Sequence, residues 1–434
     1  MPDIPREKGK KMAQVNLDNL EDRLHQGAVQ ALEDQPGQSF DRTGLEKLVW
    51  NLLQKEAVIL PRADEERLVQ RVVYRILGLG PLEPLLHDPE ITEVMVNSPT
   101  EIFIERQGRL ERVEARFRDE QHLRQIIDRI VAPLGRRVDE SMPYVDARLS
   151  DGSRVNAIIP PLAVRGPALT IRRFSATPFT LKRLVELGTL NEAMARFLQA
   201  CVRARLNILI SGGTGAGKTS TLNALAQAIP RQERLITIED TTELRLSAEN
   251  IVSLEARPPN IEGKGEITIR TLLRNALRMR PDRIIVGEVR GAEAFDMLQA
   301  MNTGHPGSLT TVHANAPADA IRRLESMVLM AGLDLPQPTI REYVASALQL
   351  IVQQERLPDG SRRVVEIAEI IPEEDDQGRL RPRLIPLFRF ERRGMDAQHR
   401  VVGAFVTLSA ALASSRALKR IRRVGLSLKD PLEE

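Results

Sequence analysis

The spacing of hydrophobic residues changes along the 434-residue chain, and each change predicts a different kind of structure. Over residues 1–77, leucine and valine recur at helical spacing, which predicts an N-terminal helical arm. Over 78–176, short runs typical of β-strands surround one helical pattern, which predicts an α+β domain. Over 191–375, apolar runs alternate with helical patterns, which predicts an α/β domain with a doubly wound, largely parallel sheet.

Two further segments connect and end this arrangement. Residues 177–190 are expected to form a hinge, in which Thr180 caps a short helix and Gly188 ends it. Residues 376–434 are expected to be a C-terminal extension. Its basic helix places Arg416, Lys419, Arg420 and Arg423 on one face. Such a face either touches an anionic membrane or is simply solvated, and the second interpretation is favoured.

Composition excludes several classes of protein. Hydrophobic residues make up 42% of the chain, enough for real cores, while the formal net charge of +3 gives little support for nucleic-acid binding. A single cysteine, Cys201, rules out an internal disulfide and a cysteine-rich structural zinc site. The N-terminus has no signal-peptide pattern, and the longest uncharged apolar stretch, 401–415, is shorter than the ~20 residues that span a bilayer. A soluble or peripheral cytoplasmic protein is expected.

A glycine-rich stretch between a predicted strand and a predicted helix carries the clearest chemistry. It matches the phosphate-binding pattern GxxxxGK[ST], in which the backbone N–H groups and the helix N-terminus hold an anion. Lys218 would contact the β- and γ-phosphates of ATP, and the Thr219 hydroxyl would bind Mg²⁺. The predicted nucleotide-binding residues here are Gly212, Gly213, Thr214, Gly215, Ala216, Gly217, Lys218, Thr219 and Ser220.

Acidic residues follow two later strands, at the sheet edge where parallel sheets bind ligands. Glu239 and Asp240 end one apolar run, and Glu288 follows Ile-Ile-Val-Gly287. Such carboxylates polarise an attacking water or hold Mg²⁺, although an aspartate at a strand end can equally cap a turn. His313 ends a third strand, where it would sense the γ-phosphate or serve a structural role.

The α+β domain contributes clustered arginines. Those that fold over a nucleotide would neutralise its γ-phosphate, whereas isolated surface arginines are usually solvated. The cluster comprises Arg136, Arg137, Arg148, Arg154, Arg172 and Arg173.

The order of these motifs resembles the secretion ATPase superfamily of type II and type IV secretion systems and type IV pili. The stretch Gly287-Glu-Val-Arg-Gly-Ala-Glu-Ala-Phe-Asp-Met-Leu-Gln-Ala-Met-Asn-Thr-Gly-His305 is most similar to the CpaF/Tad branch. Val138-Asp-Glu-Ser141 and Asp151-Gly-Ser-Arg-Val-Asn-Ala157 are similar to it too. The chain lacks the four-cysteine zinc module of many GspE-type members.

The resemblance implies a RecA-like P-loop ATPase core that forms hexameric rings and binds ATP and Mg²⁺ between two domains. It implies catalytic roles for Lys218, for Glu239 as general base and for Glu288 as the Walker B acid. Asp240, Thr219 and Glu288 would hold the metal, and His305 and His313 would lie in one histidine box. Arg154 and Arg172 would reach the nucleotide of a neighbouring subunit.

The main hypothesis is an ATP-driven motor, peripheral at the inner face of a bacterial inner membrane and bound to platform proteins. It would assemble a Tad/Flp-type pilus or secrete protein. A pilus-retraction or conjugative type IV secretion ATPase is the alternative within the same class. A nucleic-acid motor is disfavoured by the near-neutral charge, and a non-hydrolysing ATP-binding scaffold by the complete set of acidic residues.

Overall fold

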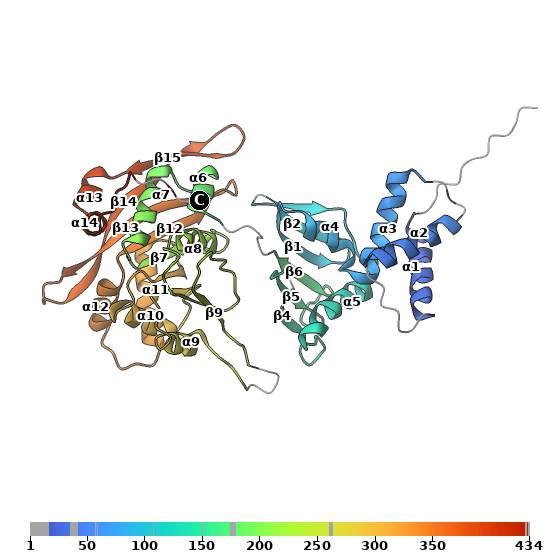
Figure 1. Cartoon of the computed structure of the whole chain (residues 1–434), viewed down its shortest axis with the longest axis horizontal. Coiled ribbons are helices and arrows are strands. Elements are labelled where there is room, and N and C mark those ends of the chain that lie inside the picture. The colour runs from blue at the N-terminus through green and yellow to red at the C-terminus, as the bar shows by residue number, and fades with distance from the viewer. Residues whose placement is uncertain are drawn as a thin grey trace, which may run out of the picture. The chain divides into compact units, whose positions relative to one another are not determined.

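The chain divides into two compact units, 1–174 and 175–434, each considered by itself (Figure 1). A computed structural model describes residues 17–34, 42–56, 58, 60–106, 108–149, 151–173, 179–259, 264–429 and 432.

The first unit begins with three helices that share a small hydrophobic core. These are α1 (Leu17–Glu33), α2 (Arg42–Lys55) and α3 (Arg62–Leu77). Buried leucines and valines spaced three or four residues apart face one another, which confirms the predicted helical arm. Arg129 of the following domain donates hydrogen bonds to the carbonyls of Arg75 and Gly78, so the arm is joined to that domain at the end of α3.

A six-stranded antiparallel sheet forms the rest of the first unit, in the order β3-β2-β1-β6-β5-β4. Helix α5 (Glu120–Val131) covers one face through Leu123, Ile126, Ile127 and Ile130, and the other face carries polar residues. Two short helical turns and α4 (Glu83–His87) complete it. The strands are β1 (Ile91–Ser98), β2 (Glu101–Arg106), β3 (Arg109–Val113), β4 (Tyr144–Arg148), β5 (Arg154–Ile158) and β6 (Ala168–Arg172).

The second unit is built on a nine-stranded sheet in the order β15-β14-β13-β12-β7-β11-β10-β8-β9. The strands from β12 to β9 run parallel, which confirms the predicted doubly wound α/β core. They are β7 (Ile208–Gly212), β8 (Leu235–Glu239), β9 (Ile251–Glu255), β10 (Arg283–Val286), β11 (Leu309–His313) and β12 (Leu350–Arg356).

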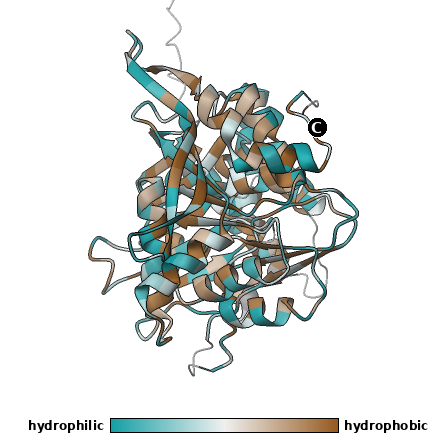
Figure 2. Ribbon diagram, turned by 90° about the vertical axis from the view of Figure 1, so that its left-hand side faces the viewer, coloured by the Kyte–Doolittle hydropathy of each residue, from teal (hydrophilic) through white to brown (hydrophobic). Residues whose placement is uncertain are grey.

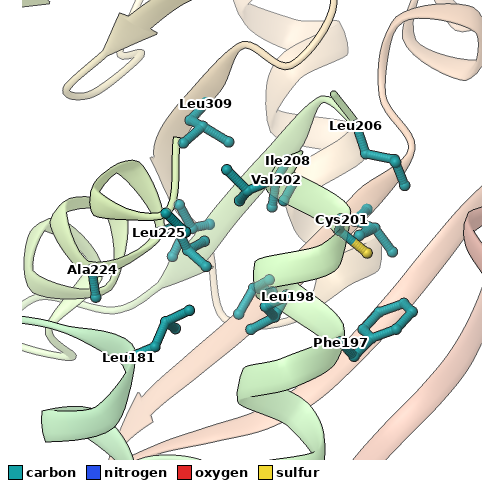
Figure 3. Packing of buried hydrophobic residues seen from close by; sticks show 14 of the residues in the cluster. Leu181, Phe197, Leu198, Cys201, Val202, Leu206, Ile208, Ala224, Leu225 and Leu309 are labelled. Atoms are coloured by element: carbon teal, nitrogen blue, oxygen red, sulfur yellow. The ribbon is translucent and has the colours of Figure 1, made fainter. Parts of the chain in front are cut away.

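Helices cover both faces of this sheet. On one face lie α6 (Leu181–Glu186), α7 (Glu192–Arg203), α8 (Lys218–Gln227) and α14 (Arg416–Arg423). On the other lie α9 (Ile269–Ala276), α10 (Glu293–Asn302), α11 (Pro317–Met330) and α12 (Gln337–Ala347). Leu198 and Val202 of α7 lie on the side of the helix that faces Leu225 of α8 (Figure 3), while Phe197 packs against the ring of Phe388. In Figure 2 the central strands are mostly hydrophobic.

The segment expected to be a hinge is largely part of this core. Thr180 caps α6 as predicted, because its side chain accepts a hydrogen bond from the Arg183 N–H. Leu181 and Leu184 are then buried in the same cluster as the helix after the phosphate loop. Residues 174–178 lie outside the described part of the chain. From Phe179 onward, the predicted hinge is therefore part of the second unit.

The expected C-terminal extension continues the same sheet. Three antiparallel strands follow β12, namely β13 (Arg362–Glu374), β14 (Leu380–Met395) and β15 (Val401–Thr407). Helices α13 (Ser409–Ser414) and α14 end this part. Residues 376–434 thus have no separate core, because Phe388 and Ile421 are buried in the cluster under α7.

Within the described residues, no helix is both long enough and apolar enough to cross a bilayer.

Candidate active site

The phosphate loop connects the central strand β7 to helix α8. Gly215 and Gly217 have φ angles of 70° and 95°, values that side-chain-bearing residues rarely adopt. Helix α8 begins at Lys218, directly after the loop, so its first N–H groups face the loop. A strand, a glycine loop and a helix N-terminus arranged in this way form an anion-binding site.

Lys218 and His313 meet beside this loop. The Lys218 side chain is 8% exposed, and its Nζ donates to the Gly213 carbonyl oxygen at 3.1 Å and lies 3.2 Å from His313 Nδ1. Strands β7 and β11 are neighbours, with His313 paired to Gly212. Burial and the Lys218 ammonium lower the pKa of His313, so its imidazole is neutral at neutral pH.

The predicted acids continue this network. Nε2 of His313 lies 2.9 Å from Oε1 of Glu288, and the other carboxylate oxygen of Glu288 lies 2.6 Å from the Arg290 guanidinium. Arg290 also lies 3.2 Å from Asp240 Oδ2. Lys218, His313, Glu288 and Asp240 therefore gather at one sheet edge, as the sequence predicted. Arg290, which links the two acids, was not predicted as a site residue.

Glu239 occupies a different environment from the other acids. It is 3% exposed, and its Oε1 accepts hydrogen bonds from the N–H groups of Glu243 and Leu244 at 2.9 and 3.1 Å. Burial raises its pKa to about 7. A Cβ atom at Gly287 would lie 2.9 Å from Glu239 Cγ, which explains why glycine occupies the position before Glu288. A carboxyl group with this pKa can exchange a proton at neutral pH.

The residues predicted to hold Mg²⁺ fit such an ion. Thr219 lies in the first turn of α8, while Glu288 and Asp240 follow neighbouring strands, so all three offer oxygen ligands. Among the described residues, the buried Oε1 of Glu288 accepts no well-aligned hydrogen bond despite the nearby imidazole. An oxygen in this state has free capacity for a cation. Mg²⁺ bound there would neutralise phosphate charge.

Two residues that the sequence interpretation missed hold the phosphate loop from the neighbouring strands. Gln354, near the end of β12, accepts a hydrogen bond from the Thr221 hydroxyl at 2.7 Å through its side-chain oxygen. Its main-chain carbonyl oxygen leaves no room for a Cβ at Gly212. Arg362, at the start of β13, donates to the Gly215 carbonyl at 2.9 Å. The one sequence signal that could have identified Gln354 was its position as a polar residue after the apolar part of a strand.

Replacement of Gln354 by alanine is expected to raise KM for ATP about tenfold and to change kcat less, because a buried hydroxyl loses its partner and the loop loses its support. Steady-state ATPase kinetics measure this. Gln398→Ala, on an exposed turn, serves as the matched control. An unchanged KM for Gln354→Ala would show that the contact does not support the loop.

In the first unit, three of the six clustered arginines form a row. Arg148, Arg154 and Arg172 are directly paired across β4, β5 and β6, so their side chains leave the same face of the sheet. This face is opposite to the one covered by α5. The row thus places three positive charges side by side on this face of the sheet.

The other three arginines lie outside the row. Arg173 donates to the carbonyls of Asp88 and Ile91, Arg136 to that of Asp146, and Arg137 pairs with Asp139. Arg154 and Arg172, which the resemblance favoured, are thus both in the row.

The two histidines of the expected histidine box lie apart. His313 ends β11 at the phosphate loop, whereas His305 lies in the turn before β11, on the other side of a five-residue strand. Only His313 contacts the site, because the ends of one strand lie on opposite edges of a sheet.

Comparison with known proteins places the chain in a family. A family model described as "Type II/IV secretion system protein" matches residues 76–372. The chain belongs to the type II/IV secretion system protein family. A putative conjugal transfer protein of Mycobacterium tuberculosis (strain H37Rv) is 40% identical over 299 residues, covering 68% of this chain and 84% of that protein. The family and the phosphate loop identify the chain as an ATPase.

Two further comparisons cover a similar share of the chain. The type IV secretion system protein VirB11 of Brucella suis is 34% identical over 330 residues, covering 69% of this chain and 91% of that protein. The crystal structure of the VirB11 ATPase from Brucella suis, in complex with sulphate, is 33% identical. It covers 66% of this chain and 94% of its own, with a TM-score of 0.36.

Proposed function

We propose that this protein is an Mg²⁺-dependent ATPase motor that powers assembly of a Tad/Flp-type pilus or protein secretion across a bacterial envelope. The observation that carries the proposal is the contact between Lys218, His313 and Glu288 beside the phosphate loop. It joins the phosphate-binding residue, a neutral imidazole and an acid into one connected site. A change at the phosphates can therefore alter the contacts at the ends of β11 and β10, which carry His313 and Glu288.

Each residue of the site has a role in hydrolysis. Lys218 and the loop N–H groups hold the phosphates, and the Thr219 hydroxyl, Glu288 and Asp240 hold Mg²⁺. Glu239 accepts the proton of the attacking water, since its pKa of about 7 suits a general base at neutral pH. His313 contacts Lys218 directly, so it registers whether the lysine is occupied by phosphate.

The arginine row supplies the remaining charge. We assign Arg154 and Arg172 to the γ-phosphate of a nucleotide held by a neighbouring subunit of a homo-hexameric ring. Support comes from their direct pairing in the sheet and from the absence of an apolar cover on that face among the described residues. Guanidinium groups neutralise the charge that develops during phosphoryl transfer.

The process that the motor drives is proposed from the motif wording, which is most similar to the CpaF/Tad branch. In this proposal the ring acts in the cytoplasm, peripheral at the inner membrane, on platform proteins of a pilus or secretion system. Conjugative transfer is the second candidate, because several relatives bear the name "conjugal transfer protein".

Deletion of the coding sequence, followed by complementation with the wild type, separates these functions. We expect loss of surface filaments or of secreted proteins, scored by electron microscopy and by analysis of the culture medium. Loss of plasmid transfer with filaments and secretion intact would instead establish the conjugative function. Filaments that persist and no longer retract would establish retraction.

A further inference from the structure

We infer that a groove at the sheet edge opposite the phosphate loop is a docking site for an acidic, partly apolar segment of another protein. The groove has a volume of about 670 Å³ and lies between the end of α8, the segment before β9 and the residues after α14. We call it the arginine-rimmed groove, after Arg203 and Arg231, which line it.

The lining of the groove combines an apolar floor with positive charge. Leu246, Val424 and Leu426 line it with apolar side chains that are at least partly exposed, and both charged residues that line it are arginines. Val424 is 53% exposed and lines the groove, so its apolar side chain is accessible to a ligand there. A ligand that complements this lining carries negative charge together with hydrophobic side chains.

Helix α14 extends the positive surface beside the groove. Its Arg416, Lys419, Arg422 and Arg423 are exposed, and residues 409–429 contain no acidic residue. Within the described part of the chain, Arg231, Arg422 and Arg423 form no salt bridge or side-chain hydrogen bond. These cations, unlike most surface arginines of this unit, are available to an external anion.

The packing of α14 argues for a protein segment and against insertion into a membrane. Its apolar residues Ala417, Leu418 and Ile421 are buried against α7 and the sheet, so no hydrophobic face is left to enter a bilayer. Arg420, which the sequence placed on the basic face, instead donates to the carbonyls of Ala204 and Arg205. A concave apolar floor with a charged rim can take up the side chains of a protein segment. The flat surface of a membrane cannot enter it in the same way.

The position of the groove lets a bound partner and a nucleotide occupy the same subunit. Helix α8 begins with Lys218 at the phosphate loop and ends with Gln227, which lines the groove. Arg203 directly precedes the turn into β7, and Arg231 the turn into β8, so both lie at the amino ends of these strands. The phosphate loop lies at their carboxyl ends.

Binding of labelled peptides to the full-length protein tests this site. We expect a peptide of about ten residues with alternating Glu and Leu to bind at least about tenfold more tightly than peptides of alternating Glu and Ser or Lys and Leu. Fluorescence anisotropy measures the affinities. Arg231→Glu is expected to weaken binding at least about tenfold, and Val424→Asp to weaken it similarly. Arg393→Glu, an exposed charge reversal on β14, is the matched control.

Several results would overturn the inference. Equal binding of the Glu–Ser peptide would show that the apolar floor is not used, and equal loss with Arg393→Glu would show nonspecific charge attraction. Binding to phosphatidylglycerol vesicles that Arg231→Glu abolishes, without peptide binding, would make the surface a lipid contact. A change in oligomeric mass for Arg231→Glu, measured by light scattering, would make it an interface between copies of the chain. The basal ATPase rate is expected to stay unchanged in both groove variants, which shows that they fold.

Discussion

Replacement of Lys218 by alanine is expected to lower the ATP turnover of the protein at least about a hundredfold, the cost of removing one preorganised charged donor. The loss has two sources. The alanine cannot neutralise phosphate charge, and it also removes the contact through which His313 and Glu288 are joined to the loop. Release of inorganic phosphate at saturating ATP measures the effect. Lys47→Ala, on an exposed position of α2, is the matched control.

The same variant tests the role of the arginine row. Arg172→Ala is expected to be nearly inactive alone, while mixed rings of Arg172→Ala and Lys218→Ala subunits regain activity. In such rings, some sites have an intact loop in one subunit and an intact arginine in the next. Mixing ratios and ring mass are followed together. No regain in confirmed mixed rings would show that Arg172 does not act across subunits, and full activity of Arg172→Ala alone would remove it from the site.

Glu239→Gln is expected to lower ATP turnover about a hundredfold or more while leaving ATP binding intact. Glutamine keeps the size of the side chain and can still accept the N–H groups of Glu243 and Leu244, so the loop stays in place. It cannot take a proton from water. Glu288→Gln is expected to impair both turnover and Mg²⁺-dependent nucleotide binding, because it weakens a metal ligand. Glu266→Gln, at an exposed position, is the control.

The ionisation of Glu239 also makes the activity of the protein depend on pH in a definite direction. Burial raises the pKa of Glu239 from 4.5 to about 7, so in the free enzyme this carboxyl group is half ionised near pH 7. We expect kcat/KM to rise with pH, to reach half of its maximum near pH 7 and to level off about one pH unit higher. A profile that is flat from pH 5 to 8 would exclude Glu239 as the base.

The free energy of unfolding should fall with rising pH, whereas the activity rises. The folded protein holds the Glu239 proton more tightly than the unfolded chain, so this group stabilises the fold fully below pH 4.5. That contribution is lost as the pH rises through about 7, and it amounts to about 3 kcal/mol at most. Glu239→Gln should therefore flatten the fall in the free energy of unfolding between these pH values. Urea titrations at several pH values measure it.

Much of the fold and of the site was readable from local patterns. The phosphate loop is recognised because its glycines, lysine and threonine are contiguous, and their chemistry depends only on a strand before and a helix after them. The acids at 239, 240 and 288 were placed at one edge because parallel strands end on the same side of a sheet. Thr180 was identified as a helix cap, and its side chain accepts the expected N–H group of Arg183.

Other features depended on which strands become neighbours, and no local pattern contains that information. Gln354 reaches the phosphate loop only because β12 pairs with β7, more than a hundred residues away in the sequence. Arg290 joins Asp240 to Glu288 only once β8 and β10 are side by side. Helical spacing put Arg420 on the basic face, but the direction in which α14 packs turned it to the end of α7.

By itself the sequence determined the nucleotide chemistry, since the phosphate loop and its acids are short motifs whose geometry is set by the elements that contain them. The tertiary structure decided which residues support that chemistry and which surfaces remain for partners. It separated His305 from His313, aligned Arg148, Arg154 and Arg172, and built residues 376–434 into the sheet. The reason is that strand register and helix packing bring together residues whose distance along the chain says nothing about their distance in space.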